Sequence, residues 1–345
     1  MGHPEYRLPR DILKNEIEDI LNLGVELKCN MRIGKDLSWD DVRKNFNAIY
    51  IAIGAQKSMT MELVDDRLEG VCGANEFLYK VNTGEIPNVG RKVVVVGGGN
   101  SAIDAARCAL RLGAKEVAIL YRRRKEDMPA LNEEIRAAEG EGIILRCLAA
   151  PVRIEGANGR LKKIICQNMT LGEFDLSGRK KSMPKIGDEF ILEADQLILA
   201  IGQKTDFSFD MKKAGITVSK SGLIEVLKGK MTETSSPMIF AGGDVVTGPD
   251  TVVGAIAAGH NAAKEIDEAI RKINGKEPYI PFEEEIEIPV IIDEDIHEMS
   301  RASACEAECM ERKNDFREVE FGFTKEQALE EAQRCLRCDI EIQTE

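Results

Sequence analysis

Residues 92–124 read KVVVVGGGNSAIDAARCALRLGAKEVAILYRRR, and this stretch decides the fold. Four consecutive valines predict a buried strand, the glycines a turn, the alanine-rich run a helix, and EVAIL a second strand. Gly97, Gly99 and Ala102 give the pattern G-x-G-x-x-A where the first strand meets the helix. Strand, glycine turn, helix and strand in this order predict an α/β domain with a parallel sheet.

The glycine turn also predicts a dinucleotide site. Because Gly97 and Gly99 carry no side chain, the backbone can approach a pyrophosphate, whose charge then faces the positive end of the helix. Gly98 lies in the same turn, and Asn100 and Ser101 add donors at the helix start. A tight turn that binds no ligand is the alternative that this pattern leaves open.

The end of the second strand predicts which nucleotide is bound. An NAD enzyme places Asp or Glu there to bind the ribose hydroxyls. This sequence has Tyr121, Arg122 and Arg123 instead. Two guanidinium groups suit a 2′-phosphate, so we expect NADP(H) rather than NAD(H). The alternative is that the two arginines are solvated side chains at a strand end and bind no ligand.

Working outward, the flanking segments predict more helices and strands. Apolar spacing, caps and turn residues indicate their types. They are an amphipathic helix at 10–23, a strand at 24–29 (GVELKC), a capped helix start at 38–42 (SWDDV), a buried strand at 48–54 (AIYIAIG) and a hairpin turn at 156–159 (GANG). The ending Ala-Ile-Gly recurs at 200–202, which suggests two related sheet units, each bringing backbone close to a ligand at a glycine.

A second candidate site lies in PMIFAGGDVVTGPDTVVGAIAAGHNAA, residues 237–263. An apolar strand runs into Gly243 and Asp244, and a small-residue helix starts near Thr251. From Thr234 onward the spacing resembles the T-x6-A-x-G-D pattern of flavoproteins with two dinucleotide-binding domains. In that family the aspartate accepts a hydrogen bond from the flavin ribityl chain. The backbone at the helix start, here Thr251 and Val252, faces the flavin ring, where a helix N-terminus stabilises the negative charge left by an arriving hydride.

Four further segments narrow the resemblance. PEYRLPRDIL (4–13), YRRRKEDMPA (121–130), ILAIGQKTDF (198–207) and GPDTVVGAIAAGHNAA (248–263) together resemble the small (β) subunit of NADPH-dependent glutamate synthase. Similar segments occur in bifurcating ferredoxin-NADP oxidoreductases and in the flavin half of dihydropyrimidine dehydrogenase. The resemblance covers residues 4–280 approximately. It implies an NADPH-linked flavin oxidoreductase subunit that passes hydride between NADP(H) and FAD, and passes electrons to iron-sulfur carriers or to a partner subunit.

The resemblance also implies site residues and partners. Arg7 would reach the FAD and the backbone near Ile33 would border its adenine. The residues that would line NADP(H) are 98–101, Arg122, Arg123, Ala200, Ile201 and Gly202. A glutamate synthase large subunit or a ferredoxin-coupled complex would be the partner. Because the cofactors carry out hydride transfer, no general acid or base is assigned.

One departure from the family concerns the flavin. No glycine-rich pattern precedes residue 97, so the expected pyrophosphate cradle for FAD is missing. Three explanations remain open: a truncated sequence, a split enzyme whose missing half-site comes from another polypeptide, or a degenerate remnant. The rival function is a non-catalytic NADP(H)-binding or scaffold subunit without FAD.

The C-terminal tail contains two cysteine pairs, Cys305 with Cys309 and Cys335 with Cys338. Four thiolates can hold an iron-sulfur cluster or zinc. The run RCLRCD resembles junctions to iron-sulfur segments in related electron-transfer proteins, which favours a 4Fe-4S cluster. A zinc site and the absence of any metal stay open.

Composition limits the other functions. The 345 residues include 47 Lys and Arg against 60 Asp and Glu, a net charge of −13, which disfavours a nucleic-acid partner. Neither a membrane span nor a secretory leader is evident, so we expect a cytoplasmic protein with reduced thiols. The predicted fold is the α/β two-dinucleotide-binding-domain flavoprotein fold. Its predicted segments are a partial FAD domain (1–87), an NADP(H) domain (88–203), a second FAD segment (204–281) and an acidic linker with the cysteine tail (282–345).

Overall fold

A parallel five-stranded sheet organises the first unit of the protein, which contains the glycine turn. The computed structural model describes residues 2–61, 68–85, 87–174, 178–280 and 300–333. The strands of this sheet, in spatial order, are β3 (Val71–Gly73), β10 (Gln196–Leu199), β4 (Lys92–Val96), β5 (Glu116–Tyr121) and β6 (Ile144–Cys147). The predicted α/β fold with a parallel sheet is confirmed. We expected the NADP(H) domain to begin at residue 88, but the edge strand β3 of this sheet comes earlier in the chain.

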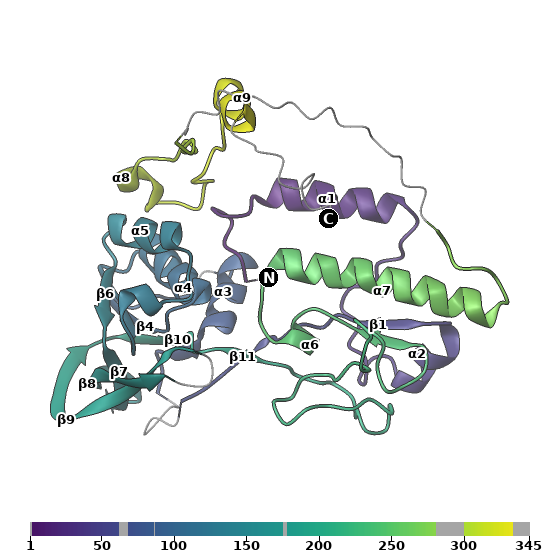
Figure 1. Ribbon diagram of the computed structural model, residues 1–345. Helices are drawn as coiled ribbons and strands as arrows, with labels where there is room; N and C mark the ends of the chain where they lie inside the picture. The colour runs from purple at the N-terminus through teal and green to yellow at the C-terminus, as the bar shows by residue number, and fades with distance from the viewer. Residues whose placement is uncertain (1, 62–67, 86, 175–177, 281–299, 334–345) are drawn as a thin grey trace.

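The four valines of β4 show why this segment is a central strand. Side chains alternate between the two faces of a sheet. Val93 and Val95 pack with helices α3 (Ala74–Asn82), α4 (Asn100–Arg111) and α5 (Asn132–Gly140), whereas Val94 and Val96 pack with a second, antiparallel sheet. Figure 1 shows the helices on one side and the antiparallel strands on the other. Both faces are covered, which accounts for an apolar run without polar alternation.

The antiparallel sheet consists of β7 (Ala149–Ala157), β8 (Arg160–Phe174) and β9 (Lys180–Glu193). Between β7 and β8 lie Asn158 and Gly159, with φ of 54° and 75°. Positive φ at both residues is the geometry of a two-residue hairpin turn, and Asn-Gly adopts it readily. The predicted hairpin is confirmed.

A second unit contains the strand pair β1 (Ile49–Ile51) and β12 (Ile239–Ala241), which are parallel. Around this pair lie α2 (Trp39–Asn45), α6 (Asp244–Thr247) and α7 (Val252–Ile273). Ser38 caps α2 by accepting a hydrogen bond from the Asp41 N–H, as predicted. Strands β2 (Lys57–Ser58) and β11 (Gln203–Lys204) pair in the two connections between the units. A 3-10 turn, η1, spans Lys125–Asp127.

The predicted strand at 24–29 is wrong. Helix α1 (Arg10–Asn22) forms as predicted, but the chain after it is neither helix nor strand. A strand needs a neighbour that satisfies its backbone N–H and C=O groups. In the part of the chain that the structure describes, β1 pairs only with β12, and no strand lies beside 24–29. Ile20 and Leu23 at the end of α1 are 55% and 85% exposed, so the apolar face of this helix is largely uncovered.

The tail folds back onto the unit that contains the five-stranded sheet. It forms α8 (Cys309–Arg312) and α9 (Lys325–Gln333). Val319, between them, is buried in the core cluster that contains α4. Most of the predicted acidic linker, and both Cys335 and Cys338, lie outside the described residues.

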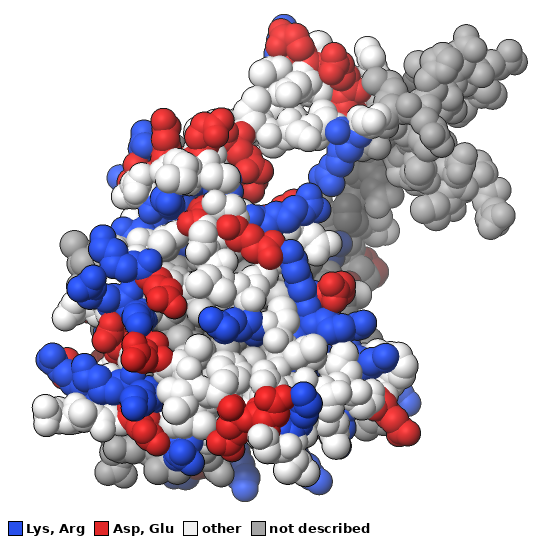
Figure 2. All heavy atoms as spheres, turned by 90° about the vertical axis from the view of Figure 1, so that its left-hand side faces the viewer, with Lys and Arg blue, Asp and Glu red and all other residues white. Residues whose placement is uncertain are grey.

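Charges of both signs cover the face drawn in Figure 2, where basic and acidic side chains are interspersed. Several of the protein's surface charges are paired, for example Lys125 with Glu139 at 2.6 Å. None of the helices in the described ranges is long and apolar enough to cross a membrane.

Candidate functional site

The three glycines of the turn after β4 differ in what a side chain at each position would meet. Gly97 has a φ of 150°, and a Cβ there would collide with the carbonyl of Ala200. A Cβ on Gly98 would collide with the Tyr121 ring. A Cβ on Gly99 would meet only Pro129 Cγ, at 3.9 Å. Gly97 and Gly98 are therefore required by packing, while Gly99 leaves space in front of the helix.

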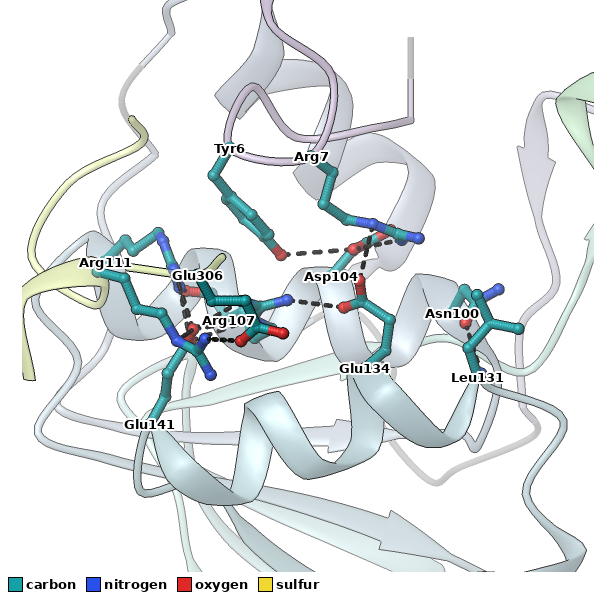
Figure 3. A network of polar contacts seen from close by, with 11 residues as sticks. Tyr6, Arg7, Asn100, Asp104, Arg107, Arg111, Leu131, Glu134, Glu141 and Glu306 are labelled. Carbon is teal, nitrogen blue, oxygen red and sulfur yellow. Dashed lines mark hydrogen bonds and ion pairs between the residues drawn. The ribbon is translucent and has the colours of Figure 1, made fainter. Parts of the chain in front are cut away.

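Helix α4 begins directly after this space. Gly99 is its N-cap, and no side chain caps the helix. The first backbone N–H groups of a helix have no partner within it and carry partial positive charge. Asn100 is fixed by its Oδ1, which accepts a hydrogen bond from the Leu131 N–H at 3.1 Å (Figure 3). The turn can therefore donate to an anion.

The two arginines at the end of β5 lie in different environments. Arg122 is exposed, and its carbonyl accepts a hydrogen bond from Ser182 Oγ at 2.8 Å. Arg123 is only 6% exposed, and its Nε donates to the Lys180 carbonyl at 2.8 Å. Arg123 thus holds the start of β9 against the end of β5, and Arg122 faces solvent.

The second candidate site lies where β12 ends. Gly243 has a φ of 71°, which lets the chain turn into Asp244. Asp244 accepts one long hydrogen bond, 3.3 Å from the Asp250 N–H, and burial raises its pKa above the usual range. Thr251 caps α7 through its Oγ1, which accepts from the Gly254 N–H at 3.1 Å. Asp244 therefore keeps acceptor capacity for a ligand.

One cleft joins the two candidate sites. Its volume is about 1390 Å³. Of the predicted residues, it is lined by Arg7, Gly99, Asn100, Ser101, Asp244, Thr251 and Val252. Leu199 and Gln203, which flank Ala200, Ile201 and Gly202, line it as well. Ile33 lies apart from this lining, and its carbonyl accepts a hydrogen bond from Ser208 Oγ at 2.5 Å.

Arg7 lines the cleft. It also belongs to an ionic network that the sequence patterns do not predict (Figure 3). Its Nη1 lies 3.0 Å from Asp104, and its Nε lies 3.2 Å from Glu134. The network continues from Glu134 to Arg107 at 2.7 Å and from Arg107 to Glu141 at 2.7 Å. The sequence contained a signal, because Asp104, Arg107 and Arg111 recur at helical spacing in a run rich in alanine.

Burial dominates the electrostatics of Asp104, which is 3% exposed. Its pKa is raised to about 6 because desolvation outweighs the attraction of Arg7. The pKa of Arg7 is raised, since its own desolvation is outweighed by Asp104 and Glu134. The ion pair is thus costly to bury, and further contacts, from Arg7 to Glu134 and from Tyr6 to Asp104, help to hold it.

The predicted cysteine site is only partly described. Cys305 is exposed, and Cys309 lies at the start of α8, close to Gly140 at the end of α5. Within the described ranges there is no group of three or more metal-ligating side chains. Cys335 and Cys338 fall outside those ranges, so the four-thiolate site stays a prediction.

The fold and the cleft together define a class of protein. Two sheet units, each with a glycine turn at a strand end, meet at a cleft between two helix N-termini. The family model for the pyridine nucleotide-disulphide oxidoreductases matches residues 12–259. The chain belongs to this family.

Relatives within the curated proteins are more specific. The chain is 41% identical over 98% of its length to the NADP(+)-dependent formate dehydrogenase subunit beta of Moorella thermoacetica, covering 49% of that protein. It is 37% identical over 98% of its length to the NADPH-Fe(3+) oxidoreductase subunit beta of Geobacter sulfurreducens, covering 55%. The resemblance to glutamate synthase small subunits is confirmed by 33% identity over 77% of the chain to that of Escherichia coli, covering 59%. The chain spans about half the length of these relatives.

Solved structures confirm the fold. Mycobacterium tuberculosis FprA, solved with NADPH, gives a TM-score of 0.62 at 17% identity, covering 79% of this chain and 75% of FprA. Thioredoxin reductase from T. acidophilum gives a TM-score of 0.51 at 20% identity, covering 65% and 66%. The predicted two-dinucleotide-binding-domain flavoprotein fold is therefore confirmed.

Proposed function

We propose that the chain is a subunit of an NADPH-linked flavin oxidoreductase in which hydride passes between NADP(H) and FAD across the cleft. One observation carries the proposal. Gly99 and Ser101 of the glycine turn line the same cleft as Asp244 and Thr251. Two nucleotide sites that share one cleft can bring two redox cofactors into contact.

The residues present fit the two cofactors. The space at Gly99 and the uncapped start of α4 suit a pyrophosphate. Asp244, with one long hydrogen bond, can accept another from a ribityl hydroxyl. The N-terminus of α7 can stabilise negative charge at a flavin ring. When bound, NADPH would supply a hydride to FAD, and the reduced flavin would release its electrons singly.

The partners follow from the same chemistry. The relatives from Moorella and Geobacter are named as subunits, and the one from Escherichia coli as a small chain. We place this chain in the cytoplasm, passing electrons to a partner subunit of the glutamate synthase large type or to a ferredoxin. A 4Fe-4S cluster on the tail cysteines would be the carrier between them.

The first half of the FAD site is proposed to come from a segment or polypeptide outside this sequence. Among the described residues β1 pairs only with β12. This free edge supports the proposal, because parallel strand pairs are stable only within larger, covered sheets. The exposed apolar side chains of α1, such as Ile20, would be covered by the same addition.

An anaerobic absorption spectrum, taken before and after NADPH is added, tests the function. Flavin bands that bleach on addition are expected when the segment or polypeptide that completes the FAD site is present. Asp244→Ala should lower the FAD content while the melting temperature stays near that of the wild type, because its hydrogen bond to Asp250 is long. A colourless chain that still quenches NADPH fluorescence would show that the nucleotide domain is intact and that the flavin half comes from elsewhere or is lost. A protein that stays colourless when FAD and the completing segment are both supplied would favour the rival function, a non-catalytic NADP(H)-binding subunit.

A further inference from the structure

Tyr6 is held between helix α4 and the tail. It is 1% exposed. The guanidinium carbons of Arg107 and Arg111 lie 4.6 and 4.2 Å from the centroid of its ring. From the tail, the Val319 N–H donates to the Tyr6 carbonyl at 3.2 Å, and the Phe316 ring lies 6.4 Å from the Tyr6 ring. The backbone at Tyr6 is therefore fixed by a segment more than 300 positions away.

The residue after Tyr6 is Arg7, which lines the cleft. Its guanidinium reaches Asp104 and Glu134. Because adjacent residues share one backbone, a shift of Tyr6 moves Arg7 relative to these carboxylates. The tail contacts at Tyr6 are thus one step from the cleft, although Val319 does not line the cleft itself.

The tail contributes one cation and one carboxylate to the ionic network, so its net charge contribution is zero. Arg312 is 5% exposed, and its Nε lies 3.2 Å from Glu141. Its Nη1 lies 2.7 Å from Glu306, which also belongs to the tail. Losing one partner of a buried ion pair is costly because it leaves an uncompensated charge. If the tail separated from Glu141, Arg312 and Glu306 would leave together, still paired with each other.

The network stays balanced without the tail. Three cations and three carboxylates then remain, namely Arg7, Arg107, Arg111, Asp104, Glu134 and Glu141. The contact between Arg312 and Glu141 is also imperfect, since the buried Arg312 Nε is close to the carboxylate but has no aligned hydrogen bond. The tail can therefore separate from the rest of the network without leaving an unpaired charge buried.

We propose that residues 306–319, the tail clamp, position Arg7 at the nucleotide cleft, so that loosening the clamp weakens dinucleotide binding. This proposal rests on the proposed function. Arg312 and Val319 act as positioning residues, because they reach the cleft only through Glu141 and Tyr6. The clamp links the cysteine-bearing tail to nucleotide affinity, and the coupling is reciprocal.

The test is Arg312→Gln in the full-length protein, with Arg317→Gln as the matched control. Arg317 lies in the same segment, but it is exposed and pairs only locally, with Asp315 at 2.7 Å. Hydrogen exchange reports on the amides of Arg7 and Leu8, which donate to the Pro4 carbonyl. Titration calorimetry gives the Kd for NADP⁺, the relevant ligand because Arg7 pairs with Asp104 of α4, and the N-terminus of α4 is the proposed pyrophosphate site. For Arg312→Gln we expect faster exchange at both amides and a Kd raised about fivefold or more. Arg312→Lys should recover part of the change, and Arg317→Gln should match the wild type.

Two results would overturn the proposal. One is an Arg312→Gln protein whose Arg7 and Leu8 amides exchange as in the wild type. The other is faster exchange with an unchanged Kd for NADP⁺. If Arg312→Gln fails to fold, Phe316→Ala decides by the same readouts, since it removes a ring contact with Tyr6 and no charge. A wild-type protein that binds no NADP⁺ would overturn the proposed function and the affinity claim, while the exchange data would still decide whether the tail holds Arg7.

Discussion

Nη1 of Arg7 lies 3.0 and 3.1 Å from the two carboxylate oxygens of Asp104, although the two residues are 97 positions apart. Arg7 belongs to the segment before α1, and Asp104 belongs to α4, which starts at the glycine turn. The pair therefore ties the N-terminal segment to the helix whose N-terminus faces the cleft. A displacement of either residue changes the wall of this cleft.

Replacing Asp104 by Asn should change how stability depends on pH. Burial raises the pKa of Asp104 to about 6, above its value in an unfolded chain. The folded state then keeps a proton that the unfolded state releases, so this residue's contribution to stability falls as pH rises from about 4 to about 6. The full change is about 3 kcal/mol for a shift of about two units.

Urea unfolding across this range measures the effect. Asp104→Asn should lose this fall, because the amide does not ionise. The exposed residue Asp40, at the start of α2, gives a matched control in Asp40→Asn. Parallel stability curves for Asp104→Asn and the wild type would contradict the prediction.

Two glycines of the same turn should respond differently to alanine. Gly97→Ala forces a φ of 150° on a residue with a Cβ and drives that Cβ into the Ala200 carbonyl. We expect a loss of about 2 kcal/mol or more in the free energy of unfolding. Gly99→Ala should leave the melting temperature nearly unchanged, because its Cβ meets only Pro129. It should raise the Kd for NADP⁺, since the Cβ occupies the space proposed for the pyrophosphate.

Thermal unfolding and calorimetric titration of the two variants separate these effects. An intact melting temperature in Gly97→Ala would contradict the packing explanation. Unchanged NADP⁺ affinity in Gly99→Ala would show that the ligand does not approach this glycine.

Arg122 and Arg123 should separate nucleotide preference from stability. Arg122→Gln should raise the KM for NADPH about tenfold or more and leave the KM for NADH nearly unchanged, since a hydrogen bond to a charged group contributes about 1.5–3 kcal/mol. Arg123→Gln should instead lower the melting temperature, because its buried Nε holds the Lys180 carbonyl. If Arg123→Gln alone abolished the preference for NADPH, the two roles would be reversed.

The cysteine prediction can be tested by iron content. After anaerobic reconstitution with iron and sulfide, Cys305→Ser and Cys309→Ser should each hold less iron than the wild type. Cys29→Ser is the control, because Cys29 is exposed and lies outside the tail. Full iron content in both tail variants would exclude these cysteines as ligands. Zinc bound in preference to iron would favour the other four-thiolate site.

Local features of the chain were predictable from the sequence. The valines of β4, the glycine turn and the Asn158–Gly159 hairpin each depend on residues close together in the chain. The incorrect prediction of a strand at 24–29 also relied only on residues close together in the chain. Its pattern is that of a strand, but a strand also needs a neighbour, and none lies beside it among the described residues.

The sequence by itself determined the α/β fold and predicted a nucleotide-binding turn at Gly97–Ser101 and a second ligand site at Asp244. Glycine conformation, helix caps and alternating apolar residues act over a few positions, so a linear pattern contains them. Only the tertiary structure decided that both sites share one cleft, that Arg123 is buried while Arg122 is exposed, and that the tail reaches Tyr6. Burial and ion pairing depend on which distant segments meet, and folding alone brings those segments together.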